Sequence, residues 1–288
     1  KLLIASTALV ATAGMAAADI TITGHAAAGI HSALDDVTTT VNTTDVAGDG
    51  VYSNAGVDFT MTGATDNGIS FSASVNIDAG TEIDTGDFEF DGGDGGTAGL
   101  GSVSMTGTFG TLTFDDGGID NLYDGDFTSA DVSYSTTIGA ISLSVAHDTS
   151  GADDANSMSA GYTASGMSFT LAASDDTDGT SSSLSVAYAL NDSVSVTGKT
   201  DQVAGAESVQ TITAATTLNG VSVSVSSANN STWDVDLGYT AGGFALTYGV
   251  DETDGWTATA TTALGGGATF SAGVDNNDST YAGVSFAF

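Results

Sequence analysis

The segment 115–131 contains the residues best suited to chemistry, because it concentrates carboxylates without a balancing base. Its aspartates are Asp115, Asp116, Asp120, Asp124, Asp126 and Asp131, and no lysine or arginine lies among them. Crowded carboxylates beside a narrow aqueous passage concentrate cations and repel anions. Carboxylate oxygens are also the ligands that Ca²⁺ prefers, so Asp115, Asp116 and Asp120 form a candidate calcium site. The sequence indicates no other cofactor.

The histidines add little further chemistry. His25, His31 and His147 are the only ones in the chain. The first two share a strand parity but lie about 20 Å apart along one strand, which is too far for a shared metal ion. Polar wall residues are the better interpretation of both. No serine or aspartate pairs with a histidine in a recognisable catalytic pattern, so we expect no enzymatic activity.

Composition sets the class of partner. The chain has 288 residues, of which 36 are acidic and 2 basic, for a formal net charge of −34. Such a charge would suit a disordered chain, but 41% hydrophobic residues do not. Nucleic acid is excluded as a partner because phosphate binding needs a basic surface. Cations are the expected counterpart.

The N-terminal residues have the layout of an export signal. Residues 1–18 combine an initial lysine, a short apolar run and an A-x-A cleavage pattern that ends at Ala18. The apolar run is too short to span a bilayer as a helix. We therefore expect a signal peptide at 1–18 and a single mature domain at 19–288.

Apolar and small polar residues alternate along most of the mature chain. Apolar side chains occupy even positions in 19–34 and odd positions in 51–63 and 69–79. Successive strand side chains point to opposite faces, so each segment has one apolar and one polar face. Further strands are predicted near 99–109, 111–115, 131–138, 141–148, 157–164, 167–174, 181–190, 193–200, 208–217, 221–227, 232–240, 244–250, 256–263, 268–275 and 279–288.

Two all-β architectures fit this alternation. A soluble sandwich buries its apolar face against a second sheet, whereas a transmembrane barrel turns that face to lipid. The polar faces here are rich in Ser, Thr, Asn, Asp and Gly, and short turns alternate strictly with longer acidic loops. Both features favour a hydrated lumen over a packed core. We predict an antiparallel up-and-down transmembrane β-barrel of 16–18 strands.

Strand parity also assigns individual side chains to the two faces. The charged residues expected on the lumen wall are Asp58, Asp78, Lys199, Asp234 and Asp236. Aromatic residues with the apolar parity lie near segment ends, as in an interfacial girdle, and they are Tyr162, Tyr188, Trp233, Tyr239, Tyr248 and Trp256.

Two motifs carry a resemblance to a known family. The last strand places Val284, Phe286 and Phe288 on one face, and bacterial outer-membrane barrels characteristically close on such a strand. The stretch GTFGTLTFDD, residues 107–116, resembles the turn-and-strand signature of the trimeric general porins of Gram-negative bacteria, in particular the Rhodobacter type. With the signal peptide and the meander of strands, the resemblance covers the whole mature chain.

The resemblance implies a location and an assembly. It implies an outer-membrane homotrimer in contact with lipid and lipopolysaccharide, through which ions and small hydrophilic solutes diffuse passively. It also implies that the loop after the fifth strand, here residues 115–130, folds into the barrel as a constriction, with Asp131 at its exit.

Two features depart from the family pattern. Family members carry a basic residue soon after the fifth strand and a basic cluster on the facing wall, whereas this chain has Asp115 and Asp116 at the first position. Only Lys199 would remain as a base after processing. The family has sixteen strands, whereas the pattern here predicts up to eighteen.

The resulting expectation is a porin that is cation-selective because its constriction is acidic. The alternative from another class is a secreted acidic adhesin or surface-layer β protein that binds calcium. A channel specific for one solute is a third interpretation, which saturable binding would distinguish.

Overall fold

The computed structural model describes residues 18–36, 48–123, 128–149, 155–177 and 179–288. These residues form one sheet of nineteen strands, in which neighbours along the chain are neighbours in space for every strand except the short β2. None of the described residues belongs to a helix that could cross a membrane. The strands are β1 (Ala18–Ser32), β2 (Asp35–Asp36), β3 (Gly50–Ala64), β4 (Ser70–Asp84), β5 (Glu89–Gly107), β6 (Gly110–Asp120), β7 (Thr128–Ile138), β8 (Ile141–His147), β9 (Asn156–Ala164), β10 (Met167–Asp176), β11 (Gly179–Asn191), β12 (Val194–Gln202), β13 (Val209–Leu218), β14 (Val221–Ala228), β15 (Trp233–Ala241), β16 (Phe244–Asp251), β17 (Trp256–Gly265), β18 (Ala268–Asp275) and β19 (Thr280–Ala287).

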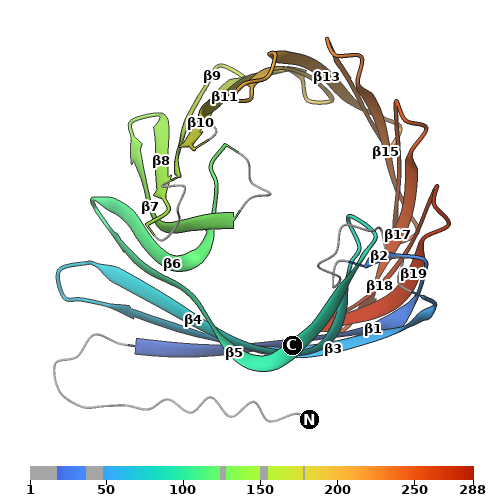
Figure 1. Ribbon diagram of the computed structural model, residues 1–288, viewed down its shortest axis with the longest axis horizontal. Helices are drawn as coiled ribbons and strands as arrows, with labels where there is room; N and C mark the ends of the chain where they lie inside the picture. The colour runs from blue at the N-terminus through green and yellow to red at the C-terminus, as the bar shows by residue number, and fades with distance from the viewer. Residues whose placement is uncertain (1–17, 37–47, 124–127, 150–154, 178) are drawn as a thin grey trace.

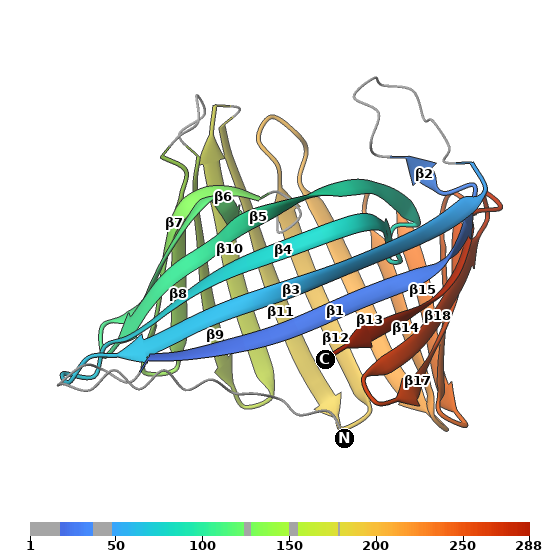
Figure 2. The same cartoon turned by 90° about the horizontal axis from the view of Figure 1, so that it is seen from below.

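The sheet closes into a barrel because the first and last strands pair. β1 pairs with β3 on one side and with β19 on the other, both antiparallel. The short β2 is an extra strand that pairs in parallel with the start of β5, so the barrel wall has eighteen strands. Figure 1 looks along the open ring, and Figure 2 shows the strands tilted around it. The predicted fold is confirmed, at the upper end of the predicted strand number.

The C-terminal strand makes the closing contacts that its sequence predicted. Val284 and Phe286 pair with Ala28 and Ala26 of β1. Backbone hydrogen bonds of 2.6 and 2.8 Å then join Phe288 and Gly24. The ladder therefore continues without a gap across the seam between the two ends of the chain.

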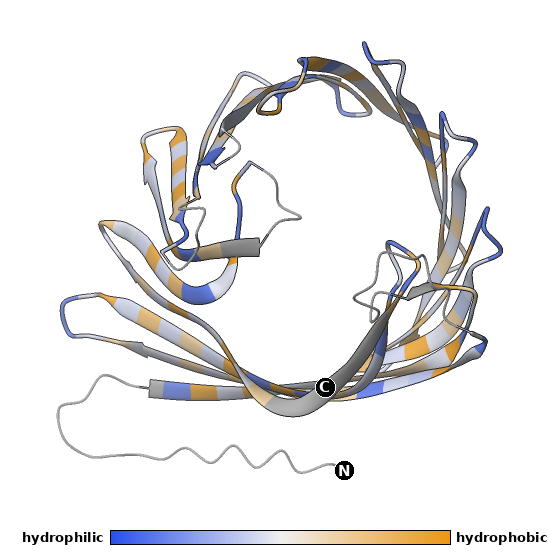
Figure 3. Cartoon of the chain, viewed as in Figure 1, coloured by the Kyte–Doolittle hydropathy of each residue, from blue (hydrophilic) through white to orange (hydrophobic). Residues whose placement is uncertain are grey.

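The apolar face of the sheet points away from the barrel. Ile20, Leu100 and Phe71 are exposed on that face, as are most other large apolar residues of the strands. Figure 3 shows the alternation of hydrophobic and hydrophilic residues along strands such as β4 and β8. A soluble sandwich would bury this face, so the sandwich architecture is wrong for this chain. Lipid is the solvent that this face requires.

Two predicted strands are longer in the structure. β5 was expected to start at residue 99 but begins at Glu89, and β6 was expected to end at residue 115 but extends to Asp120. Both extensions run through glycine-rich sequence, which carries no apolar alternation that would have marked it as a strand. Asp115, Asp116 and Asp120 therefore lie in an irregular strand end rather than in the loop that follows.

The turn of the GTFG motif depends on one glycine. Gly107 pairs with Gly110, so Thr108 and Phe109 form the turn between β5 and β6. Gly110 has φ of 116°, and a Cβ at this position would meet the backbone carbonyl of Ser135 on the next strand. Only glycine fits there, for conformational and steric reasons together.

Replacement of this glycine should destabilise the barrel. We expect Gly110→Ala to lower the free energy of unfolding by about 1–3 kcal/mol, the usual cost of a strained backbone position. Unfolding in urea, followed by tryptophan fluorescence in detergent, measures the change. Gly198→Ala is the matched control, because Gly198 lies in β12 with no heavy atom within 4 Å of an added Cβ. Equal stabilities of the two variants would contradict the prediction.

Candidate pore constriction

The end of β6 leaves the barrel wall through a wide bulge. Phe114 still pairs with Val132 of β7, and the next pair joins Ile119 to Ala130. Residues 115–118 thus stand opposite a single residue of β7, Asp131. The extra residues have no ladder partners, so the chain bends out of the sheet at this point.

Asp131 holds the bulge in place from inside the wall. Its side chain is buried, and one carboxylate oxygen accepts a hydrogen bond of 2.9 Å from the Gly117 amide. The other oxygen accepts bonds of 2.6 and 2.5 Å from the amide and hydroxyl of Thr149. Asp131 was predicted to line the constriction, but these contacts give its carboxylate the role of positioning the strand that does.

Beyond the bulge, the chain docks on the inner face of more distant strands. The Asn121 side chain donates a hydrogen bond of 2.9 Å to the Ser174 hydroxyl of β10. The Leu122 amide donates one of 3.0 Å to the Ser157 hydroxyl of β9. Asn121 also accepts a bond of 2.9 Å from the Tyr123 amide, which tightens the local turn. The segment therefore crosses β7 and β8 inside the ring, as Figure 1 shows.

The acidic residues of this segment are only partly brought together. Asp116 and Asp120 are exposed and Asp115 is half-buried, with its carboxylate against the Cα of Gly118, where a Cβ would lie 2.5 Å from it. Asp124 and Asp126 lie outside the described residues. Over the part of the chain that the structure describes, no group of three or more metal-binding side chains is close enough to hold an ion.

One part of the lumen wall carries a histidine between two aspartates. His25 lies 3.8 Å from Asp58 and 3.3 Å from Asp78, on adjacent strands β1, β3 and β4. Asn76 donates a hydrogen bond of 2.7 Å to the second oxygen of Asp78. Both aspartates thus lie on the polar face, as strand parity predicted, and they share their position with the most exposed histidine of that face.

The wall base has a local partner. Lys199 of β12 makes an ion pair of 3.0 Å with Asp201, two residues further along the same face. Its charge is therefore offset at short range. Lys1, the only other base of the chain, lies outside the described residues.

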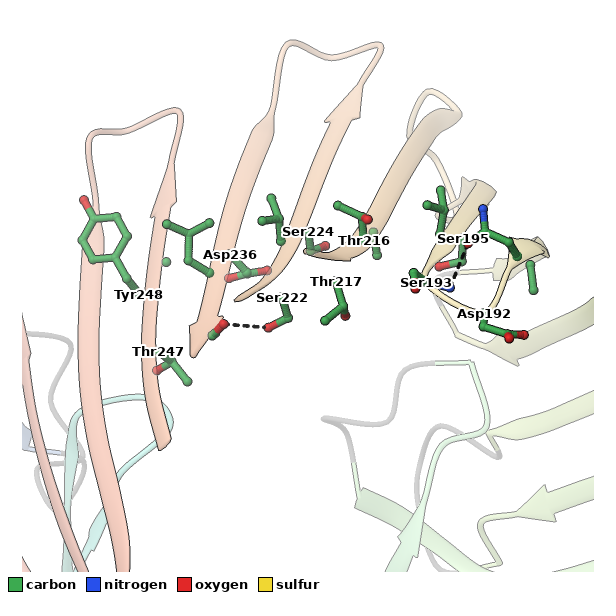
Figure 4. A pocket seen from close by; sticks show the side chains of 18 of the residues that line it. Asp192, Ser193, Ser195, Thr216, Thr217, Ser222, Ser224, Asp236, Thr247 and Tyr248 are labelled. Atoms are coloured by element: carbon green, nitrogen blue, oxygen red, sulfur yellow. Dashed lines mark hydrogen bonds between the residues drawn. The ribbon is translucent and has the colours of Figure 1, made fainter. Parts of the chain in front are cut away.

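Asp236 lines a hollow of about 640 Å³ on the inner face of β11–β17. Hydroxyl side chains surround it, and Ser222 donates a hydrogen bond of 3.2 Å to the Gly238 carbonyl within this surface. Figure 4 shows Ser222, Ser224 and Asp236 on neighbouring strands of this wall. Asp234 shares the parity of Asp236 and pairs with Asp251 of β16. In this register the two aspartates share one face of β15, the face that lines the hollow.

The predicted aromatic girdle lies on the apolar face. Five of its members are at least 38% exposed, and Trp256 stacks on Tyr248 with ring centroids 6.3 Å apart. Tyr162, Tyr188 and Tyr239 lie near short turns, whereas Trp233 and Trp256 follow longer loops. The aromatic residues therefore lie towards both ends of the barrel, and their role as an interfacial girdle stays a prediction.

The docking residues of the inward segment were not predicted. Asn121, Ser157 and Ser174 belong to strands or loops whose separation in sequence hides their contact. Inward parity of the two serines was their only signal, and it is shared by many other serines of the chain. A protease-digestion experiment tests these contacts and requires no measurement of ion conductance.

Asn121→Ala should release the inward segment. The change removes hydrogen bonds at both ends of the side chain, a loss of about 1–2 kcal/mol that should speed cleavage at Tyr123 roughly tenfold. Chymotrypsin digestion of the folded protein in detergent, with the fragments identified by mass, measures the rate. Asn230→Ala is the control, because Asn230 bonds its own loop in the same manner. Faster cleavage in both variants, or in neither, would contradict the docking role of Asn121.

Comparison with known proteins agrees with this geometry. Residues 5–286 match the family model of the Gram-negative porins. No curated protein sequence matches the chain significantly. Among solved structures, a mutant of the Rhodobacter blastica porin is similar with a TM-score of 0.56 and 16% identity, over 93% of this chain and 100% of that one. Acinetobacter baumannii OccAB2 has a TM-score of 0.61 and 9% identity over 94% and 98% of the two chains.

A third similar structure is Salmonella typhi OmpF in complex with daunomycin, with a TM-score of 0.52 and 12% identity over 96% of this chain and 98% of that one. At such identities these structures show a shared fold. The match to the family model over nearly the whole chain shows family membership as well. The closed barrel, its inward segment and this match together establish that the chain belongs to the Gram-negative porin family and resides in the outer membrane.

Proposed function

We propose that this porin conducts cations in preference to anions, by passive diffusion together with small hydrophilic solutes. The supporting observation is the acidic segment that leaves β6 and docks inside the barrel through Asn121. In this proposal the segment holds Asp115, Asp116 and Asp120 beside the passage. The one base on the described wall, Lys199, is already paired with Asp201.

The geometry explains why charge of one sign should dominate transport. A barrel of eighteen strands encloses an aqueous channel rather than a packed interior. Lipid and protein around that channel have a low dielectric constant, so the field of fixed carboxylates is focused along the water. Cations are concentrated there and anions are repelled.

The range of this effect depends on salt. The screening length is about 8 Å at physiological ionic strength and about 3 Å at 1 M. Fixed charges on the wall then influence only ions that pass close to them. Selectivity should therefore be strong in dilute salt and weak in concentrated salt, which distinguishes an electrostatic filter from a steric one.

The surroundings follow from the two faces of the sheet. Membrane lipid and lipopolysaccharide are the proposed partners of the outward apolar face. A homotrimer is the proposed assembly, as the family resemblance implies. Chemical cross-linking in native membranes tests the assembly, with a band at three times the subunit mass as the expected product.

Calcium binding at Asp115, Asp116 and Asp120 stays a prediction. Any ion held there needs further oxygen ligands from water, because the described residues offer no three-ligand group. Titration of the folded protein with CaCl₂ in a calorimeter tests it. Saturable heat that disappears in Asp116→Asn would support a site, and heat unchanged by that substitution would count against it.

Neutralising the inward acids should reduce cation selectivity. In a planar bilayer with a tenfold KCl gradient, the zero-current potential should lie well towards the ideal cation limit of ~59 mV. The triple variant Asp115→Asn, Asp116→Asn, Asp120→Asn should move it towards zero, and raising the salt on both sides should do the same.

A charge-matched control separates local from overall effects. Asp66→Asn, Asp254→Asn and Asp278→Asn remove the same charge from exposed positions in a turn and two loops at the barrel ends. This control should keep the potential close to that of the parent protein. Equal losses in both triple variants would show that net charge, not the inward segment, sets selectivity. If the parent protein conducts ions without preference, the proposed cation selectivity is rejected and the proposed open channel is retained.

A further inference from the structure

Aromatic rings and glycines alternate across one part of the inner wall. Gly273 of β18, Tyr281 of β19, His31 of β1 and Gly50 of β3 are cross-strand neighbours in a single row. A Cβ at Gly273 would meet the ring of Tyr281, and a Cβ at Gly50 would lie 2.7 Å from the His31 ring. Each ring therefore lies flat over a glycine of the next strand, which leaves a smooth apolar surface inside the barrel.

This surface is covered by the tip of the β4–β5 hairpin, residues 83–90. Phe88 is only 3% exposed and packs on Tyr281, with ring centroids 5.3 Å apart. Phe90 stacks on His31 with ring centroids 4.7 Å apart. Leu34 is fully buried in the same cluster. We name these five residues the inner aromatic cluster. It is a small packed core on the inner side of the barrel wall.

Polar contacts fix the position of the hairpin tip. The Tyr281 hydroxyl donates a hydrogen bond of 3.3 Å to the Thr85 carbonyl. Asp84 accepts a bond of 2.7 Å from the Gly86 amide and so shapes the turn. The start of β5 also pairs with β2, where Asp35 lies opposite Glu89. The tip is thus held by ring packing, by a hydrogen bond to Tyr281 of β19 and by a short parallel ladder with β2.

The hairpin reaches this surface because its strands are irregular. The β4–β5 pairing shifts register at three places, and each shift bends the ribbon. Gly80 has φ of 116°, and a Cβ there would meet the backbone carbonyl of Ser53 on β3. The hairpin can therefore fold across β3 and β1 to β19. Figures 1 and 2 show its tip inside the ring near β2, on the side opposite the end of β6.

The hairpin tip carries carboxylates and no base. Asp84 and Asp87 are exposed, and Glu89 is half-buried beside them. The general-porin pattern would place basic residues across from the acidic segment. In this chain the structure across the ring is a second acidic loop.

We propose that the β4–β5 hairpin tip is a second constriction element, anchored by the inner aromatic cluster, whose carboxylates face the acidic end of β6 across the pore. This inference rests on the proposed function. It assigns ion selectivity to two separate loops and makes Phe88 a positioning residue for the second of them. Cations would then pass between two acidic loops. In the general-porin pattern they would instead pass between an acidic loop and a basic wall, which creates an electric field across the pore.

Single cysteines test whether the tip lies in the ion path. The chain has no cysteine, so Asp87→Cys introduces a unique thiol at an exposed position. Modification with a trimethylammonium-ethyl methanethiosulfonate places a bulky cation there. We expect lower single-channel conductance and a zero-current potential closer to zero. Asp254→Cys, in the loop between β16 and β17, is the matched control and should respond weakly.

The role of Phe88 needs a variant of its own. Phe88→Ala should free the tip, which raises the conductance of the channel and weakens the block that modification of a thiol at position 87 produces in the double variant. Phe88→Leu retains an apolar side chain and should restore most of the parent behaviour. Heat-modifiable migration on a gel verifies that each barrel is folded. A folded Phe88→Ala barrel with parent conductance and an undiminished block after modification at position 87 would overturn the anchoring role.

The outcomes separate this inference from the proposed function. Equal responses of the thiols at 87 and 254, in a channel that keeps its cation preference, would overturn the second constriction and leave the first. A folded parent protein without conductance would overturn the proposed function itself. Loss of selectivity after modification at 87 but not at 254 would support both.

Discussion

The whole structure depends on one constraint: every backbone N–H and C=O group must form a hydrogen bond within the protein, because lipid provides no hydrogen-bonding partners. Lipid cannot accept or donate, so each strand must find a partner on both sides and the sheet must close on itself. Pairing of β1 with β19 meets this requirement. The alternation of side chains then follows, because one face of a closed sheet meets lipid and the other encloses water. Irregular backbone is tolerated only on the inside, and the two described strand pairs with more than one register shift, β4–β5 and β6–β7, each send a segment inward.

The two inward segments solve the same problem with different chemistry. The end of β6 leaves the ladder at a bulge opposite Asp131, and hydrogen bonds to the buried residues Ser157 and Ser174 attach it to the wall. The hairpin tip is held mainly by ring packing, on a surface that glycines keep flat. A hydrogen-bonded attachment is sensitive to the loss of one partner. An apolar attachment depends more on the shape of the packed rings, so the loss of ring volume should loosen the hairpin tip more than the loss of a single polar contact.

The local pattern predicted the parts of the structure that depend on local periodicity. Alternation located the strands, assigned Asp58, Asp78 and Asp236 to the polar face, and identified the closing residues Val284 and Phe286. It did not reveal the extension of β5, since glycines have no side chain to alternate. It placed His31 on an open polar wall, whereas the structure buries it under Phe90. The contact between Phe88 and Tyr281 joins residues from opposite halves of the chain, and no local signal could indicate it. The buried bonds of Asp131 were hidden for the same reason.

The seam between β1 and β19 has a consequence for how the molecule is made. The Ser279 hydroxyl bonds the Ala33 carbonyl across 246 residues of sequence, and the strands around it are joined over similar separations. Such contacts have the highest loop-closure entropy in the molecule and tend to form late. Until the last strand arrives, two long edges stay open and able to pair with other chains. An incomplete chain would thus be a template for aggregation rather than a smaller pore, and assembly would need to keep both edges covered until the final strand is in place.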